Sequence, residues 1–175
     1  MNNLKLKAMK NLKALTLLLT IGLFAACSED DSATTVNSNN SFAGTYTLTA
    51  INTPKMIDFD LNGIPSANLM EEVNCYQGSR IVLNEDGNYT SLYSFANLEA
   101  KTGCDFENSE GMWNISGNEL GLVKMSAGEM QEDYFTVSGR QLKKVLVNAS
   151  YPDRDENNEP IYSTGDVILT YTKNQ

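Results

Sequence analysis

Hydrophobic and polar positions alternate with a period of two over most of this chain. Residues 45–51, Thr-Tyr-Thr-Leu-Thr-Ala-Ile, are one example. Such alternation is typical of a strand that has one face in a core and the other in solvent. Similar runs occur at 80–83, 88–95, 112–115, 119–125, 134–137, 141–147 and 166–172. The pattern therefore predicts an all-β domain of about eight short strands.

Short polar segments separate these runs, and three of them carry glycine at the centre. Gly87, Gly117 and Gly139 lie where a hairpin turn needs a positive φ. Strands that hairpins join in sequence order form an antiparallel up-and-down meander, which closes as a barrel or bends strongly.

Two segments do not fit the strand pattern. Residues 66–73 have helical spacing, with Ser66 as the expected N-cap, and predict one short helix as a lid or plug at a barrel end. Residues 149–162 are rich in Asp, Asn and Pro. They predict a long hairpin connection, which is either a functional rim or mobile.

The N-terminal segment follows a different order. Basic residues precede the apolar run 15–24, which is shorter than the ~20 residues that span a bilayer, and two alanines follow before Cys27. This order is typical of a signal peptide. The motif Phe-Ala-Ala-Cys resembles a lipobox, in which the cysteine becomes the diacylated first residue of a bacterial lipoprotein. We expect a signal peptide at 1–26 and a lipid on Cys27; an ordinary secretory leader is the alternative.

The residues after Cys27 are polar and acidic. Residues 28–31, Ser-Glu-Asp-Asp, resemble the export signal that sends some Gram-negative lipoproteins to the cell surface, although a solvated acidic tail is the alternative. The polar segment 27–41 predicts a flexible tether, in which Asp-Ser-Ala resembles an O-glycosylation acceptor motif at Ser32. We therefore expect a folded domain at 42–175, anchored by its lipid to the outer membrane at the cell surface.

The charge balance and the absence of histidine restrict the function. The chain has 13 Lys and Arg against 22 Asp and Glu, so nucleic acid is not an expected partner. With no His, a Ser-His-Asp site, a Cys-His site and His-ligated zinc are excluded. Acidic groups at 105–110 and 153–159 have the composition of solvated loops. We expect a protein without catalytic activity.

Beyond Cys27 the chain has two cysteines, Cys75 and Cys104. An exported protein folds in an oxidising compartment, where disulfides persist. The sequence therefore predicts one disulfide between them, and two reduced buried thiols are the alternative.

One acidic motif matches the first half of a calcium loop. Asp58, Asp60 and Asn62 follow the spacing Asp-x-Asp-x-Asn-Gly, in which alternate oxygens face one ion and the glycine makes a sharp turn. The twelfth position, where a bidentate Glu belongs, is Leu69, and the next two glutamates come two and three residues later. The motif predicts a weak calcium site, or simply a strand that ends in a Gly turn; no other cofactor is expected.

Several segments resemble the lipocalin-like domains of Gram-negative surface lipoproteins. They are the Gly-x-aromatic opening at 44–46, Glu-Asp-Gly-Asn-Tyr at 85–89, Gly-Met-Trp-Asn-Ile at 111–115 and the closing strand 169–173. The resemblance implies a lipocalin-like barrel that encloses one small apolar ligand. The expected ligand-binding residues are Tyr46, Tyr89, Tyr93 and Trp113, whose alternative role is core packing.

Two classes of function remain. The first is a binding module for a small apolar molecule or a glycan fragment. The second is a structural barrel with a filled core whose outer face or loops meet a protein partner. A cavity distinguishes the two, because a packed small barrel has no volume for a ligand.

Overall fold

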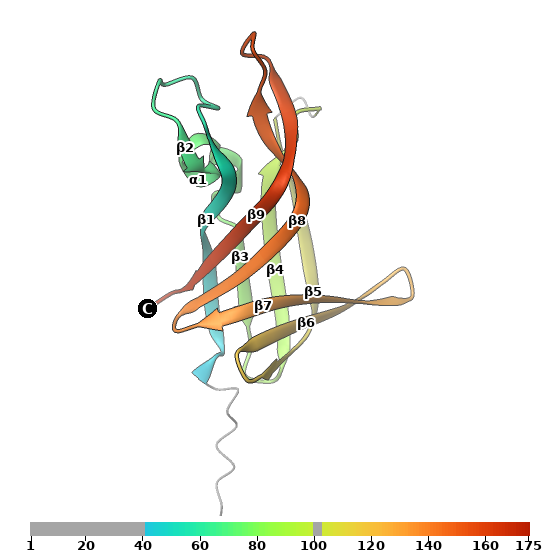
Figure 1. The fold of residues 1–175 in the computed structure, drawn as a ribbon. Helices are drawn as coiled ribbons and strands as arrows, with labels where there is room; N and C mark the ends of the chain where they lie inside the picture. Colours follow the sequence, from blue (N-terminus) through green and yellow to red (C-terminus); the bar gives the residue numbers. More distant parts are fainter. Residues whose placement is uncertain (1–40, 100–102) are drawn as a thin grey trace, which may run out of the picture. The chain divides into compact units, whose positions relative to one another are not determined.

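A computed structural model describes residues 41–99 and 103–175, and it contains an eight-stranded antiparallel barrel (Figure 1). Each strand pairs with the next along the chain, and pairing of the first strand with the last closes the sheet. The strands are β1 (Gly44–Ile57), β3 (Arg80–Leu83), β4 (Asn88–Ala96), β5 (Cys104–Ser116), β6 (Glu119–Ser126), β7 (Glu129–Ser138), β8 (Gln141–Arg154) and β9 (Pro160–Lys173). The predicted antiparallel up-and-down barrel of about eight strands is confirmed.

Within the barrel, strand β1 is shared between two ladders. Gly44–Thr47 pairs with β3, and Tyr46–Asn52 pairs with β9, so two of its residues pair on both sides. The register with β9 shifts between Leu48 and Ala50, which leaves Thr49 as the extra residue of a bulge. The hydroxyl of Thr49 hydrogen-bonds to the carbonyl oxygen of Thr170 at 3.2 Å. The bulge therefore keeps the strand attached while it bends.

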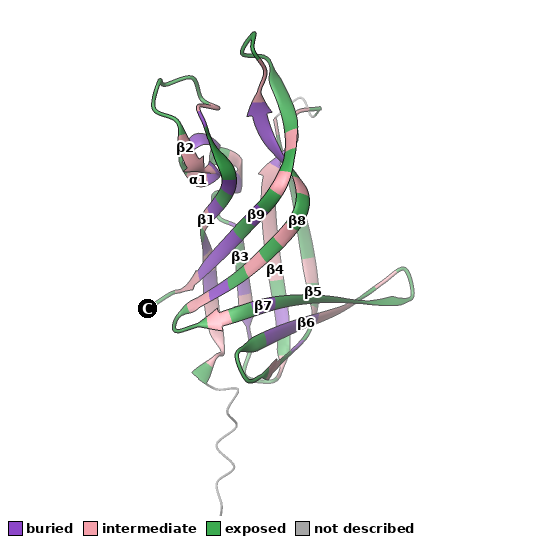
Figure 2. Cartoon of the chain, in the orientation of Figure 1, coloured by how far each residue is buried: buried purple, intermediate pink, exposed green. Residues whose placement is uncertain are grey.

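Bulges also change which positions face the core. On β1 the buried positions are Tyr46 and Leu48 before the bulge and Ile51 after it. On β8 the register shifts between Leu146 and Ala149 in the same way. Figure 2 shows buried and exposed positions alternating along β8 and β9. The period-two pattern of the sequence thus survives on both sides of each shift, with its phase reversed.

Buried polar groups of the aromatic core have partners. The Tyr46 hydroxyl donates to the carbonyl oxygen of Phe42 at 2.9 Å, and the Trp113 indole Nε1 donates to that of Asn84 at 2.9 Å. Both side chains are almost fully buried, at 2% and 4% exposure. They stabilise the barrel through packing without leaving an unsatisfied donor.

The segment expected to be a helix is only partly helical. Residues Ser66–Asn68 form a short strand, β2, that pairs with β1, and the helix α1 covers Leu69–Glu72. Ser66 is therefore not the N-cap. Asn68 takes that role because its Oδ1 accepts from Met70 N at 3.2 Å and also from Ile51 N of β1 at 2.9 Å.

A 3-10 turn, η2 (Asn74–Tyr76), follows α1. Leu69, Val73 and Tyr76 of this region are buried in the barrel core. The segment thus contributes apolar surface to the core, as a plug would. Among the described residues, the helices are too short and too polar to cross a membrane.

The prediction of a long connection at 149–162 was wrong. Strand β8 continues to Arg154 and β9 begins at Pro160, so only a tight turn separates them. In that turn, Asp155 Oδ1 accepts from the backbone N–H groups of Asn157 and Glu159, both at 2.8 Å. The Asp and Asn residues that suggested a long loop instead satisfy the backbone of a short one.

The predicted disulfide between Cys75 and Cys104 is confirmed, with a Cα–Cα distance of 5.3 Å. It joins η2 to the first residue of β5. That strand begins eight residues before the predicted 112–115 run, because residues 104–111 continue the ladder with β4.

Replacing both cysteines by serine should lower the free energy of unfolding by about 3.5 kcal/mol, because the bridge closes a loop of this length in the unfolded chain. The two cysteines are 29 residues apart. Urea unfolding without reductant measures the change. Wild-type protein with reductant should unfold like the double variant; equal stability of all three samples would contradict the prediction.

A buried carboxylate gives a second prediction. Asp153 is 4% exposed and forms an ion pair with Lys55 of β1. Burial raises its pKa, but hydrogen bonds from Lys55, Ser163 and the Arg154 N–H, with the Lys55 charge, leave that pKa below its ordinary value. The folded pKa is therefore lower than the unfolded one. The resulting stability is fully present above pH about 4 and is lost as pH falls through the folded pKa.

Asp153→Asn should destabilise the protein by about 2 kcal/mol at pH 7, because hydrogen bonds to a charged group are lost. The gap between variant and wild type should narrow at pH about 3, because the carboxyl of the unfolded chain, with a pKa of about 3.9, has largely taken up its proton there. Urea unfolding at both pH values tests this. Glu129→Gln removes an exposed charge and should leave stability unchanged at both; a pH-independent gap for Asp153→Asn would refute the linkage.

Candidate functional site

The interior of the barrel contains a cavity of about 210 Å³. Seven of the barrel strands, β3 to β9, contribute inward-facing side chains to its wall. The wall has one apolar and aromatic part and one charged part. A cavity of this kind, with apolar walls and a few polar groups, is the default place to look for ligand binding.

Aromatic side chains form much of the apolar wall. Phe135 and Tyr171 meet edge to face with ring centroids 6.0 Å apart. Tyr93 lies against the same cavity and stacks on Phe95 at 5.8 Å. Burial raises the pKa of Tyr93 to about 12 and raises that of Tyr171 as well. These hydroxyl groups therefore stay protonated at neutral pH and can donate hydrogen bonds into the cavity.

Two ion pairs form the charged part of the wall. Lys124 Nζ lies 3.0 Å from Glu107 Oε1, and Lys144 Nζ lies 2.5 Å from Asp133 Oδ1. Lys124 also donates to the Ser109 hydroxyl at 3.1 Å. The lysine side chains are mostly covered, while the carboxylates are more than half exposed. The two pairs cancel in charge and lie where the cavity meets solvent.

The structure separates the four expected ligand-binding aromatics into two groups. Tyr89 and Tyr93 line the cavity. Tyr46 and Trp113 lie elsewhere in the core, where their polar atoms are bonded to backbone carbonyls. Ligand contact by these residues stays a prediction, and the geometry supports it best for the first two.

The charged part of the cavity wall was not predicted from the sequence, although the sequence contains a signal for it. Lys124 lies in phase with the buried Leu120 and Leu122 on β6. Asp133 lies in phase with the buried Phe135 on β7. A charged residue at a position whose phase is otherwise apolar indicates an inward-facing charge, and pairs of opposite sign on adjacent strands could have been sought.

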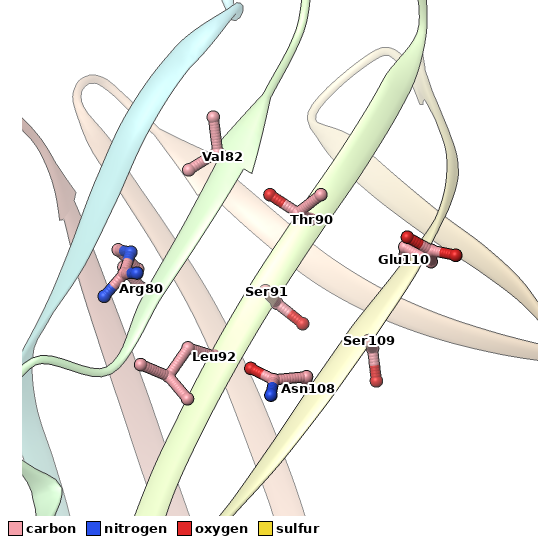
Figure 3. A pocket seen from close by; sticks show the side chains of 8 residues that line it. All are labelled: Arg80, Val82, Thr90, Ser91, Leu92, Asn108, Ser109 and Glu110. Carbon is pink, nitrogen blue, oxygen red and sulfur yellow. The ribbon is translucent and has the colours of Figure 1, made fainter.

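A second hollow of about 470 Å³ lies on the outer face of β3, β4 and β5 (Figure 3). The residues that line it are Arg80, Val82, Thr90, Ser91, Leu92, Asn108, Ser109 and Glu110. Its side chains are largely cross-strand neighbours, such as Val82 opposite Thr90, and half of them are exposed. An open polar surface holds a small ligand on one side only, so the interior cavity is the better candidate.

The acidic motif forms a cluster away from the cavity. Asp58 and Asp60 lie together, and Glu72 of α1 joins them, with ligand atoms within 4.8 Å of one another. Asn62, the third expected ligand, donates through Nδ2 to Asp60 and accepts through Oδ1 from Ile64 N. Its role as a metal ligand stays a prediction.

Two expected modification sites, the lipid on Cys27 and the glycan on Ser32, lie outside the described residues. Both stay predictions.

Comparison with protein families matches residues 42–144 to a family described as the lipocalin-like domain. Comparisons with curated proteins and with solved structures gave no match. The matched segment begins at Phe42, just before β1, and ends within β8. The remainder of β8 and strand β9 complete the barrel. Because the match spans more than half of the chain and the fold is the closed up-and-down barrel that it implies, the chain belongs to the lipocalin-like domain family.

Proposed function

We propose that the protein is a non-catalytic binding protein that holds one small apolar molecule inside its barrel. The cavity of about 210 Å³ is the observation that carries this proposal. It is smaller than the ~300–1,000 Å³ of pockets for drug-sized ligands, so the ligand is correspondingly small. An eight-stranded barrel is wide enough either to be filled by side chains or to hold one such molecule.

The wall of the cavity restricts the chemistry of the ligand. Its aromatic part favours a flat apolar body that packs on Tyr93, Phe135 and Tyr171. Lys124 and Lys144 already have carboxylate partners, so a charged ligand would have to displace one of them. An uncharged polar group, placed near Ser109 and the ion pairs, fits this wall better than an ionic one.

An alternative function is protein interaction through the outer face. Met125 of β6 and Met130 of β7 are cross-strand partners, and both are exposed, at 70% and 63%. Figure 1 shows the β6–β7 hairpin extending away from the neighbouring strands. Exposed methionines adapt to varied partner surfaces, which is the specific support for this alternative.

The order of basic, apolar and small residues before Cys27 supports a proposal for where the domain is located. We propose a signal peptide at 1–26, lipidation of Cys27, a tether at 27–41 and the barrel domain at 42–175, with the protein held on the outer membrane at the cell surface. A diacylated cysteine with a further chain provides more than one lipid signal, which is what stable anchoring requires. The membrane is then a partner through the lipid alone.

Ser91 offers a direct test of the interior cavity. It lies on β4 between Tyr89 and Tyr93, and it lines the interior cavity while also bordering the outer hollow. Ser91→Phe should fill the cavity and weaken binding of N-phenyl-1-naphthylamine, a neutral fluorescent apolar probe, by about tenfold or more, which is ~1.4 kcal/mol. Fluorescence titration of the full chain measures the affinity, and thermal unfolding verifies that each variant is folded.

The matched control is Thr90→Phe, which adds the same ring to the outer hollow one residue away. It should leave probe affinity unchanged. Loss of binding in Thr90→Phe alone would place the probe on the outer face, and equal affinity for both variants and wild type would contradict binding inside the barrel.

Cys27→Ser tests the anchor. Expressed from its own leader in a Gram-negative bacterium, the wild-type chain should fractionate with membranes and carry the added mass of its acyl chains on the fragment that contains Cys27. The serine variant should lose both, because serine cannot be processed as a lipobox cysteine. If both proteins were found with the membranes and neither carried the added acyl mass, lipidation of Cys27 would be contradicted.

A further inference from the structure

We propose that the segment between β1 and α1 binds one calcium ion through the carboxylates of Asp58, Asp60 and Glu72. One ligand atom from each residue lies within 4.8 Å of the other two. Oxygens that bind calcium lie 2.3–2.6 Å from the ion, so two of them are at most about 5 Å apart. The three carboxylates are therefore close enough to bind the same ion.

A buried oxygen without a partner points to a ligand at this place. Among the described residues, Asp58 Oδ1 is the buried side-chain atom that makes no hydrogen bond. The other oxygen of the same carboxylate accepts from Gly63 N at 2.9 Å. An unsatisfied buried acceptor is unfavourable, and more so when it is charged. A cation beside Oδ1 removes that cost.

Glu72 is the most deeply buried member of the cluster, with 5% of its surface exposed. Its Oε2 accepts from Phe59 N at 2.9 Å, which fixes the carboxylate beside the two aspartates. A buried glutamate is rare unless it is paired. Its position next to two further carboxylates is unfavourable without a positive charge to balance them.

Among residues 41–99 and 103–175, no ion pair supplies that positive charge. The salt bridges of the described residues involve Asp153, Glu107 and Asp133, and none includes the cluster. Arg154 packs over the Phe59 ring at 4.9 Å, but its Nε donates to the Phe59 carbonyl oxygen and its Nη1 to that of Asn158. Its hydrogen bonds are therefore directed at carbonyl groups.

The backbone of the loop brings the oxygens together. Asp60 Oδ1 accepts from Asn62 N at 3.0 Å, and both Leu61 and Gly63 have positive φ, 60° and 85°. A leucine in the left-handed region is strained, because its Cβ lies too close to the following carbonyl oxygen. The chain adopts this sharp turn where the sequence has the spacing of the first half of a calcium loop.

The structure also explains why Glu72 can act as a ligand although it lies three residues after the twelfth position of the calcium-loop motif. The extra residues form β2 and the Asn68-capped start of α1. Asn68 is tied to Ile51 of β1, so the chain returns toward the motif before Glu72. In the proposal Glu72 takes the place of the bidentate glutamate, and Asn62 supports Asp60 through its amide group.

The donor set determines the kind of ion. All three ligands are carboxylate oxygens, which hard cations prefer, and the exposed Asp60 leaves room for water ligands. A three-carboxylate site built on a short loop corresponds to the weak extracellular class, with a dissociation constant of about 0.1–1 mM. Binding would fasten the end of β1 to α1, and it is independent of the ligand in the barrel.

The test is thermal unfolding of the full chain after treatment with EDTA. Addition of 10 mM CaCl2, about ten times the upper dissociation constant, should raise the melting temperature by several degrees, and calorimetric titration should give one site per chain. Magnesium should shift the melting temperature less because it requires a more rigid octahedral site. An unchanged melting temperature together with no heat of binding would overturn the proposal.

Variants locate the site. Glu72→Gln and Asp60→Asn should abolish the calcium shift. Glu71→Gln is the matched control, since Glu71 is the exposed neighbour on α1 outside the cluster, and it should keep the shift. Because Asp60 is exposed, its variant should fold even if Glu72→Gln does not. In EDTA, Asp60→Asn should melt at or above the wild-type temperature, because a repulsion is relieved. A calcium shift retained by Asp60→Asn, or lost in Glu71→Gln, would overturn the assignment.

Discussion

The backbone ladder between β1 and β9 is the interaction on which the rest of the structure depends. It joins the first strand to the last, from Tyr46 opposite Lys173 to Asn52 opposite Ile168. Without it the sheet would be an open meander with two unpaired edges, and its inner face would be exposed to water. With it, the inward side chains of all eight strands enclose a common interior. Both the core and the candidate ligand cavity therefore follow from this closure, and the Thr49 bulge provides the bend that it requires.

The alternation of the sequence identified the strands well because apolar positions on a barrel strand face inward at every second residue. The alternation did not identify strands that are polar on both faces. Residues 104–111 pair with β4 although only Ser109 and Gly111 are even partly covered. Asp153 belongs to a buried stretch of β8, and its charge is balanced by Lys55 on a strand far away in the sequence. Such long-range partners are not visible in a local pattern, so the polar composition suggested loops.

The functional sites show the same limit. Tyr89 and Tyr93 belong to a set of four aromatic residues that we expected to contact a ligand, and of the four only these two line the cavity. The charges of Lys124 and Asp133 looked like ordinary surface residues until their strands were placed in a closed barrel. Glu72 was discounted by its distance along the chain, but β2 and α1 return it to the aspartates. Spacing along the sequence describes a site only when no folded element intervenes.

The sharing of β1 between β3 and β9 also determines the order in which the domain can assemble. The hairpins from β3 to β9 join neighbours in sequence, so they involve only short loops. The closing ladder joins segments that are distant in sequence. Beside it, the Thr47 hydroxyl donates a hydrogen bond to the Asn174 side chain, 127 residues further along the chain. Loop-closure entropy opposes that step until most of the meander is in place. We therefore expect the enclosed interior to form last, when β1 pairs with β9.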